Sequence, residues 1–247
     1  MNAVPEAPVI EQEQRYPFWH YSDLALFLGL AVPGLFVCLL IVTGIARVLP
    51  FGMPNRAVLG LYAQFLAYGA WLASLWLIFR ARYDAPLAKS LAWIVPRRGL
   101  SLSVLLGPAL AISVALLGRI LNTPQIDDPF RKLLHGPLAI SVLGISVVLL
   151  GPLLEELVFR GFVLPLLMRD LGVISGILAT AIPFALLHGP QYSWQWQYVV
   201  LILLVGSTLG IVRYRTGSTL ASALLHILYN ATIFTGYLAE LTRQGSK

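Results

Sequence analysis

Residues 141–167 decide the fold, and they read SVLGISVVLLGPLLEELVFRGFVLPLL. The stretch is apolar almost throughout and is longer than the roughly 20 residues that a helix needs to cross a membrane. Glu155, Glu156 and Arg160 lie near its middle. Ionisable side chains are costly inside a bilayer and are found there mainly where they have a function. This stretch therefore predicts a membrane helix that carries part of a functional site.

The composition of the whole chain agrees with a membrane location. Of the 247 residues, 58% are hydrophobic and 11% are charged, and the mean hydropathy is +0.80. Soluble domains have about 25% charged residues, so we predict an integral membrane protein without a large soluble domain. The net charge is +6, and the basic residues cluster between apolar runs. We therefore expect anionic lipid headgroups as partners and no nucleic acid.

Apolar runs predict an all-α, polytopic bundle of about seven transmembrane helices, because backbone polar groups in lipid must find partners within their own segment. The fifth run is short, and the fourth is too long for one straight crossing and contains Gly151-Pro152, where we expect a kink. The seven runs cover residues 24–46, 57–79, 101–121, 137–167, 171–187, 196–213 and 218–238.

The positions of the polar residues suggest a division of the chain. Residues 1–136 are predicted to form an N-terminal interfacial segment and three anchoring helices. Residues 137–238 are predicted to form the catalytic core from the last four spans, and residues 239–247 to form a tail. The short loops and termini favour a prokaryotic plasma membrane.

Two segments near the predicted spans have interfacial character. Four aromatic residues precede the first span and are typical of an aromatic belt at the membrane surface: Tyr16, Phe18, Trp19 and Tyr21. Residues 81–100 alternate apolar and basic residues, which favours either an amphipathic helix on the membrane surface or an ordinary positive loop. The positive-inside rule places this segment, which includes Arg97 and Arg98, in the cytoplasm.

The two adjacent acidic residues must point in different directions on a helix. Glu156 and Arg160 are four positions apart and share one face, so we expect them to pair. Glu155 then points elsewhere without a local partner, as suits a general base. The alternative is an ion pair that only holds neighbouring helices together.

Two further segments place polar pairs at the same spacing. Phe184 and His188 share a face near the end of one apolar run, and His226 and Asn230 share a face within the last. A histidine can orient a base or hold a water molecule, and converging donors stabilise an oxyanion. Alone, each pair is also explained as a helix end or as contacts between membrane helices. Together with Glu155, they predict one buried site.

At these residues the chain resembles the CPBP intramembrane proteases, which include the type II CAAX prenyl endopeptidases and bacteriocin-processing relatives. The three parts of the family pattern occur in order, as Glu-Glu-x-x-x-Arg at 155–160, Phe-x-x-x-His at 184–188 and His-x-x-x-Asn at 226–230. The resemblance covers roughly residues 137–238. It implies hydrolysis of a peptide bond in a membrane-associated peptide or protein.

The resemblance also implies roles for the individual residues. Glu155 is expected to activate a water molecule that His188 helps to hold, and His226 and Asn230 are expected to stabilise the oxyanion. Supporting roles fall to the remaining members of the pattern, which are Glu156, Arg160 and Phe184.

Metal dependence and two other functions stay open at this point. Glu155, His188 and His226 could form a zinc site of two histidines and one glutamate, but they lack the His-Glu-x-x-His spacing, so we favour a metal-free site. A proton-coupled transporter would also bury acids and histidines. A non-catalytic immunity or scaffold protein of the same fold is the other alternative.

Overall fold

The computed structural model describes residues 16–48, 56–96, 99–126 and 137–245. Within these residues the chain is all-helical, as predicted, and contains no strand. The elements in chain order are α1 (Tyr21–Val48), α2 (Arg56–Tyr83), α3 (Leu87–Ser90), α4 (Leu100–Ile120), α5 (Pro137–Gly144), η2 (Ile145–Leu150), α6 (Gly151–Glu156), η3 (Leu157–Val163), α7 (Leu164–Leu171), α8 (Val173–Leu187), η4 (Gly189–Tyr192), α9 (Trp196–Thr216) and α10 (Thr219–Gly245).

Five helical stretches in the described residues are long and apolar enough to cross a membrane, so the predicted count of about seven is not confirmed. The fifth predicted run forms α8, an apolar helix of 15 residues. The last forms α10, which has 27 residues but is not among the five. Its polar residues, His226 and Asn230 among them, lower its hydropathy. The five stretches are Tyr21–Val48, Val58–Tyr83, Leu100–Ile120, Ile140–Leu171 and Trp196–Thr216.

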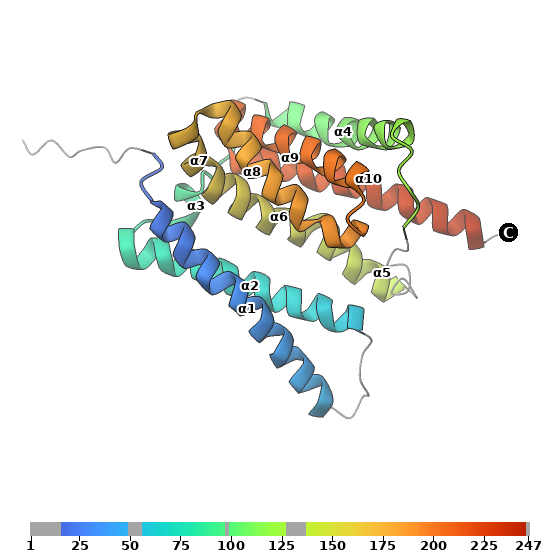
Figure 1. Ribbon diagram of the computed structural model, residues 1–247, viewed down its shortest axis with the longest axis horizontal. Helices are drawn as coiled ribbons and strands as arrows, with labels where there is room; N and C mark the ends of the chain where they lie inside the picture. Colours follow the sequence, from blue (N-terminus) through green and yellow to red (C-terminus); the bar gives the residue numbers. More distant parts are fainter. Residues whose placement is uncertain (1–15, 49–55, 97–98, 127–136, 246–247) are drawn as a thin grey trace, which may run out of the picture.

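The helical run from α5 to α7 lies at the centre of the bundle (Figure 1). Helices α1 and α2 pack together along one side of it, while α4, α8, α9 and α10 lie on the other side. Helix α4 packs along α10, and α8 packs against both α7 and α9. The predicted boundary at residue 136 stays a prediction, although these contacts cross it.

The central run changes its backbone geometry on both sides of α6. Segments η2 and η3 are π-helical, and the Gly151 N–H donates to the carbonyl oxygen of Ser146, five residues back. Pro152 follows directly and has no N–H to donate. The irregularity that we expected at Gly151-Pro152 thus includes a change of hydrogen-bond register. Such π-helical turns often occur at functional sites.

The segment before α1 is partly buried, and Trp19 anchors it in the protein. Trp19 is fully buried, and its Nε1 donates to the carbonyl oxygen of Phe162 in η3 at 3.0 Å. Arg169 Nη1 donates to the carbonyl oxygens of Pro17 and Trp19. The prediction of a surface aromatic belt is therefore wrong for Trp19, because the ring packs into an aromatic core with Phe79 and Phe162.

The basic segment 81–100 does not form a surface helix in its described part. Helix α2 continues to Tyr83 and α3 is a single turn, so the loop alternative holds. Leu91 is fully buried, and its carbonyl oxygen accepts a hydrogen bond from Thr219 Oγ1. Leu91 therefore faces protein, whereas Ile94 and Val95 farther along the segment are exposed. Arg97 and Arg98 lie outside the described residues.

Glycines allow α8 and α9 to approach closely. A Cβ at Gly206 would lie 3.2 Å from the Ala181 Cβ, and one at Gly210 would lie 3.1 Å from Ile177 Cγ2. Small residues four apart commonly form such contacts between membrane helices. This packing fixes α8, and hence His188, against the helix that follows it.

We expect Gly210→Leu to lower the thermal stability of the detergent-solubilised protein. The new side chain would overlap Ile177, and overpacking of this kind costs about 1–3 kcal/mol. Gly29→Leu is the matched control, because a Cβ there meets nothing within 4 Å. Equal unfolding temperatures for the two variants would contradict the close contact between α8 and α9.

Candidate active site

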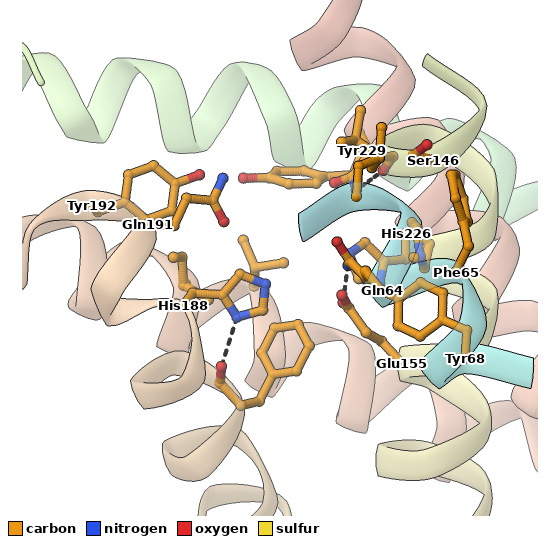
Figure 2. Close-up of a pocket in the computed structure, with 18 residues that line it drawn as sticks. Gln64, Phe65, Tyr68, Ser146, Glu155, His188, Gln191, Tyr192, His226 and Tyr229 are labelled. Atoms are coloured by element: carbon orange, nitrogen blue, oxygen red, sulfur yellow. Dashed lines mark hydrogen bonds and ion pairs between the residues drawn. The ribbon is translucent and has the colours of Figure 1, made fainter. Parts of the chain in front are cut away.

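The residues of the three sequence motifs meet around one cavity of about 350 Å³ (Figure 2). Glu155 reaches it from α6, His188 from the end of α8, and His226 and Asn230 from α10. Phe184 also lines it, whereas Glu156 and Arg160 lie behind the wall. The remaining lining residues are Leu61, Gln64, Phe65, Tyr68, Ser146, Val147, Gly151, Pro152, Gln191, Tyr192, Ile202, Val205 and Tyr229.

Glu156 and Arg160 form a fully buried ion pair. Arg160 Nη1 donates to Glu156 Oε1 at 2.8 Å, as the spacing predicts, and Nη2 donates to the carbonyl oxygen of Gly206 at 2.9 Å. The guanidinium also lies over the Phe184 ring, 4.5 Å from its centroid. Phe184 thus covers a buried cation, and the pair joins the central run to α9.

Glu156 accepts two further hydrogen bonds from α10. His226 Nδ1 lies 3.0 Å from Glu156 Oε1, and Ser222 Oγ donates to Oε2 at 2.8 Å. Because an ionised carboxylate only accepts, Nδ1 of His226 must carry the proton. Sequence analysis missed Ser222. Its position four residues before His226, on the same face of the helix, is the signal that could have indicated it.

Glu155 points away from this cluster and into the cavity. Its side chain is 26% exposed, and its Oε2 lies 3.9 Å from Nε2 of His226. This distance is too long for a direct hydrogen bond. The imidazole of His226 therefore lies between the two carboxylates, bonded to Glu156 and turned towards Glu155 (Figure 2).

His188 faces the same cavity from the opposite wall (Figure 2). Its Nδ1 lies 2.8 Å from the carbonyl oxygen of Phe184, so Nδ1 carries the proton and Nε2 is left as an acceptor. Gly189-Pro190 ends α8 directly after it. In the described part of the chain, no hydrogen bond or ion pair joins His188 to Glu155. The two residues thus share a cavity but are not in contact.

Asn230 donates a hydrogen bond to a backbone carbonyl group that lacks its usual helical donor. Its Nδ2 donates to the carbonyl oxygen of Val147 at 2.7 Å. In a π-helix that carbonyl would accept from the N–H of residue 152, but residue 152 is proline and has no N–H. In an α-helix it would accept from the N–H of Gly151, but that N–H donates to the carbonyl oxygen of Ser146 instead. A buried carbonyl without a donor is costly. Asn230 supplies the missing donor and retains one further N–H.

Helix α2 contributes residues that sequence analysis did not assign to the site. Leu61, Gln64, Phe65 and Tyr68 line the cavity, and Gln64 Nε2 donates to the hydroxyl of Tyr68 at 2.5 Å. Their spacing fits one helix face, but no sequence motif connects them to the acidic pair. Their role depends on how α2 docks against the central run.

The proposed zinc ligands do not fit a metal site in this arrangement. Within the described residues, no three histidine, cysteine, aspartate or glutamate side chains come together in a way that could hold a metal ion. Glu155 and His226 face each other, but His188 lies on the other wall with Nδ1 bonded to the Phe184 backbone. We therefore derive no chemical step through a metal.

A second cavity of about 650 Å³ adjoins the first. The two share the lining residues Val147, Gln191, Tyr192, Ile202, Tyr229 and Asn230. The second cavity extends between α4, α9 and α10, and the stacked rings of Tyr192 and Tyr198 lie on its wall.

Comparison with protein families gives a match to part of the chain. Residues 137–232 match the family described as type II CAAX prenyl endopeptidase Rce1-like. No curated protein and no solved structure matches the chain significantly. The family match confirms the resemblance read from the motifs, and it supports a function of the CAAX-type intramembrane protease kind. Together with the apolar helices, it supports a membrane-integral protein.

We expect Arg160→Met to destabilise the protein strongly. Removing one partner of a buried ion pair leaves the other charge uncompensated, which costs about 3–5 kcal/mol. Unfolding of the detergent-solubilised protein measures the loss, and adding Glu156→Gln should recover part of it. The control is Arg80→Met, which breaks an exposed pair with Asp84 and should cost about 1 kcal/mol or less. Equal losses for Arg160→Met and Arg80→Met would contradict the assignment.

Proposed function

We propose that the Rce1-like membrane domain of residues 137–232 hydrolyses a peptide bond of a membrane-associated peptide or protein, with Glu155 as the general base. One observation carries the proposal. Glu155 enters a cavity opposite an imidazole nitrogen whose orientation is fixed from behind by a second, buried carboxylate, that of Glu156. A base, an oriented histidine and a carboxylate that holds the histidine form a common hydrolytic arrangement.

The attacking water fits between Glu155 and His226. The 3.9 Å gap between Oε2 and Nε2 is too long for a direct bond but suits a water molecule that donates one hydrogen bond to each atom. The water oxygen then attacks the scissile carbonyl carbon while Glu155 takes its proton. The C=O π electrons move to the carbonyl oxygen. When the C–N bond breaks, the leaving amine takes the proton from Glu155.

The tautomers lead us to propose roles for the two histidines that differ from those implied by the family resemblance. His226 in its Nδ1–H form presents Nε2 as an acceptor, so it orients the water and does not donate to the oxyanion. His188, also with an accepting Nε2, receives a hydrogen bond from the amide of the substrate across the cavity. Asn230 keeps one free N–H for the developing oxyanion. Glu156 and Arg160 hold the geometry.

The substrate is proposed to reach this site through the second cavity. Six residues line both spaces, so an extended peptide in the larger one leads directly to Glu155. Tyrosine, glutamine and threonine side chains alternate there with aliphatic ones, as suits a backbone with apolar side chains. Membrane lipids are the proposed partners of the apolar outer faces of the helices.

Comparing membrane proteomes of cells that produce wild-type protein or Glu155→Gln tests the proposal. We expect new peptide termini with the wild type and their loss with the variant, because removal of a general base slows catalysis by about 10²–10⁴-fold. Glu240→Gln, which changes an exposed carboxylate on α10, is the matched control and should retain the cleavage.

Identical termini for wild type and Glu155→Gln, with both proteins present at equal abundance, would refute the protease assignment. A scaffold or immunity protein would give that result while keeping its phenotype. A proton-coupled transporter would instead lose ion flux in Glu155→Gln without any change in peptide termini.

A further inference from the structure

The three sequence motifs bring few groups into the cavity that can donate a hydrogen bond to an oxyanion. Nε2 is an acceptor in the neutral tautomer of both His188 and His226, because each Nδ1 carries the proton. Asn230 has already committed one N–H to Val147. Hydrolysis of an amide develops negative charge on the carbonyl oxygen, and pre-oriented donors are the usual means of stabilising it. With both imidazoles neutral, the motif residues that line the cavity supply one such donor, Asn230, and a second has to come from another lining residue.

Tyr68 on α2 presents a hydroxyl that can fill that gap. The residue is buried, with 9% of its surface exposed, and it lines the cavity. Gln64 Nε2 donates to the Tyr68 hydroxyl oxygen at 2.5 Å, so the hydroxyl accepts this bond and keeps its own proton for another partner. In the described part of the chain, no protein acceptor takes that proton. A phenol keeps its proton at neutral pH.

The hydroxyl lies on the same side of the cavity as Glu155. A Cβ at Gly151 would lie 3.7 Å from both Glu155 Oε1 and the Tyr68 hydroxyl oxygen, so the two groups share the space above this glycine. Figure 2 shows Gln64 and Tyr68 beside Glu155 and across the cavity from His188. A carbonyl carbon attacked by water at Glu155 would bring its oxygen within reach of Tyr68.

The position of Tyr68 is held by its neighbours. Its ring contacts Trp71 at a centroid distance of 5.8 Å, and Trp71 Nε1 donates to the carbonyl oxygen of Ala31 on α1. Gln64 orients the hydroxyl from one turn earlier on α2. The donor is thus oriented before any substrate binds, which is the condition under which such a group contributes most to catalysis.

We propose that Tyr68 is a further catalytic residue that donates a hydrogen bond from its hydroxyl to the oxyanion of the tetrahedral intermediate, with Gln64 as its positioning residue. No proton is transferred in this step, and the C=O electron pair remains on the oxygen until the C–N bond breaks. The inference rests on the proposed hydrolysis. It assigns a catalytic role to α2, which lies outside the matched residues 137–232.

Tyr68→Phe tests the inference because it removes only the hydroxyl. The full-length protein is assayed in detergent with a fluorogenic peptide that carries a cleavage sequence found in wild-type but not Glu155→Gln membranes. Loss of one oxyanion donor lowers kcat by about 10²–10³-fold, and we expect KM to stay within about threefold, since the bond forms only in the transition state. Gln64→Met, which leaves the hydroxyl in place without its donor, should give a smaller loss in kcat.

Tyr62→Phe is the matched control, since Tyr62 lies on the same helix, is 51% exposed and does not line the cavity. It should leave kcat unchanged. Unfolding temperatures of all variants separate a loss of folding from a loss of catalysis. If wild type cleaves the peptide and folded Tyr68→Phe retains kcat within threefold, the role of Tyr68 is refuted while the protease assignment stands. If no Glu155-dependent cleavage is found, both are refuted.

Discussion

The buried carboxylate of Glu156 is the interaction on which the rest of the structure depends. A charge in a membrane-spanning bundle is tolerated only when its hydrogen-bonding capacity is met. Arg160, His226 and Ser222 all donate to this one group, and Arg160 continues to a carbonyl of α9. The central run, α9 and α10 are thereby held in one register. The same bonds fix which nitrogen of His226 faces the cavity. The residues that stabilise the buried carboxylate therefore also orient the imidazole beside Glu155.

The spacing of residues along each helix made part of this site predictable. Pairs four positions apart share a helix face, which correctly indicated that Glu156 pairs with Arg160 and that Glu155 points elsewhere. The apolar surroundings of three distant polar groups indicated that they meet, and they do meet around one cavity.

The contacts that spacing did not reveal depend on tertiary docking. Tyr68 and Gln64 are ordinary residues of an apolar helix until α2 lies beside the central run, and Ser222 becomes notable only when Glu156 faces it. The sequence left two alternatives open for residues 81–100 for the same reason. An alternation of apolar and basic residues specifies a face but not what covers it, and here Leu91 packs against protein rather than lipid. Likewise, hydropathy alone cannot count the spans, since α10 carries the site and is less apolar for that reason.

The bond from Asn230 to the carbonyl oxygen of Val147 has an evolutionary consequence. The amide does the work of an N–H that the imino acid at position 152 lacks, so the two positions form one unit although they lie on different helices. A substitution at position 152 should therefore change which residues are tolerated at position 230, and the reverse. Among descendants of this chain, loss of Pro152 would relax the demand for an amide at position 230, whereas loss of the amide would favour restoring an ordinary helical residue at 152. Correlated substitutions at positions 152 and 230 among related sequences would reflect this hydrogen bond.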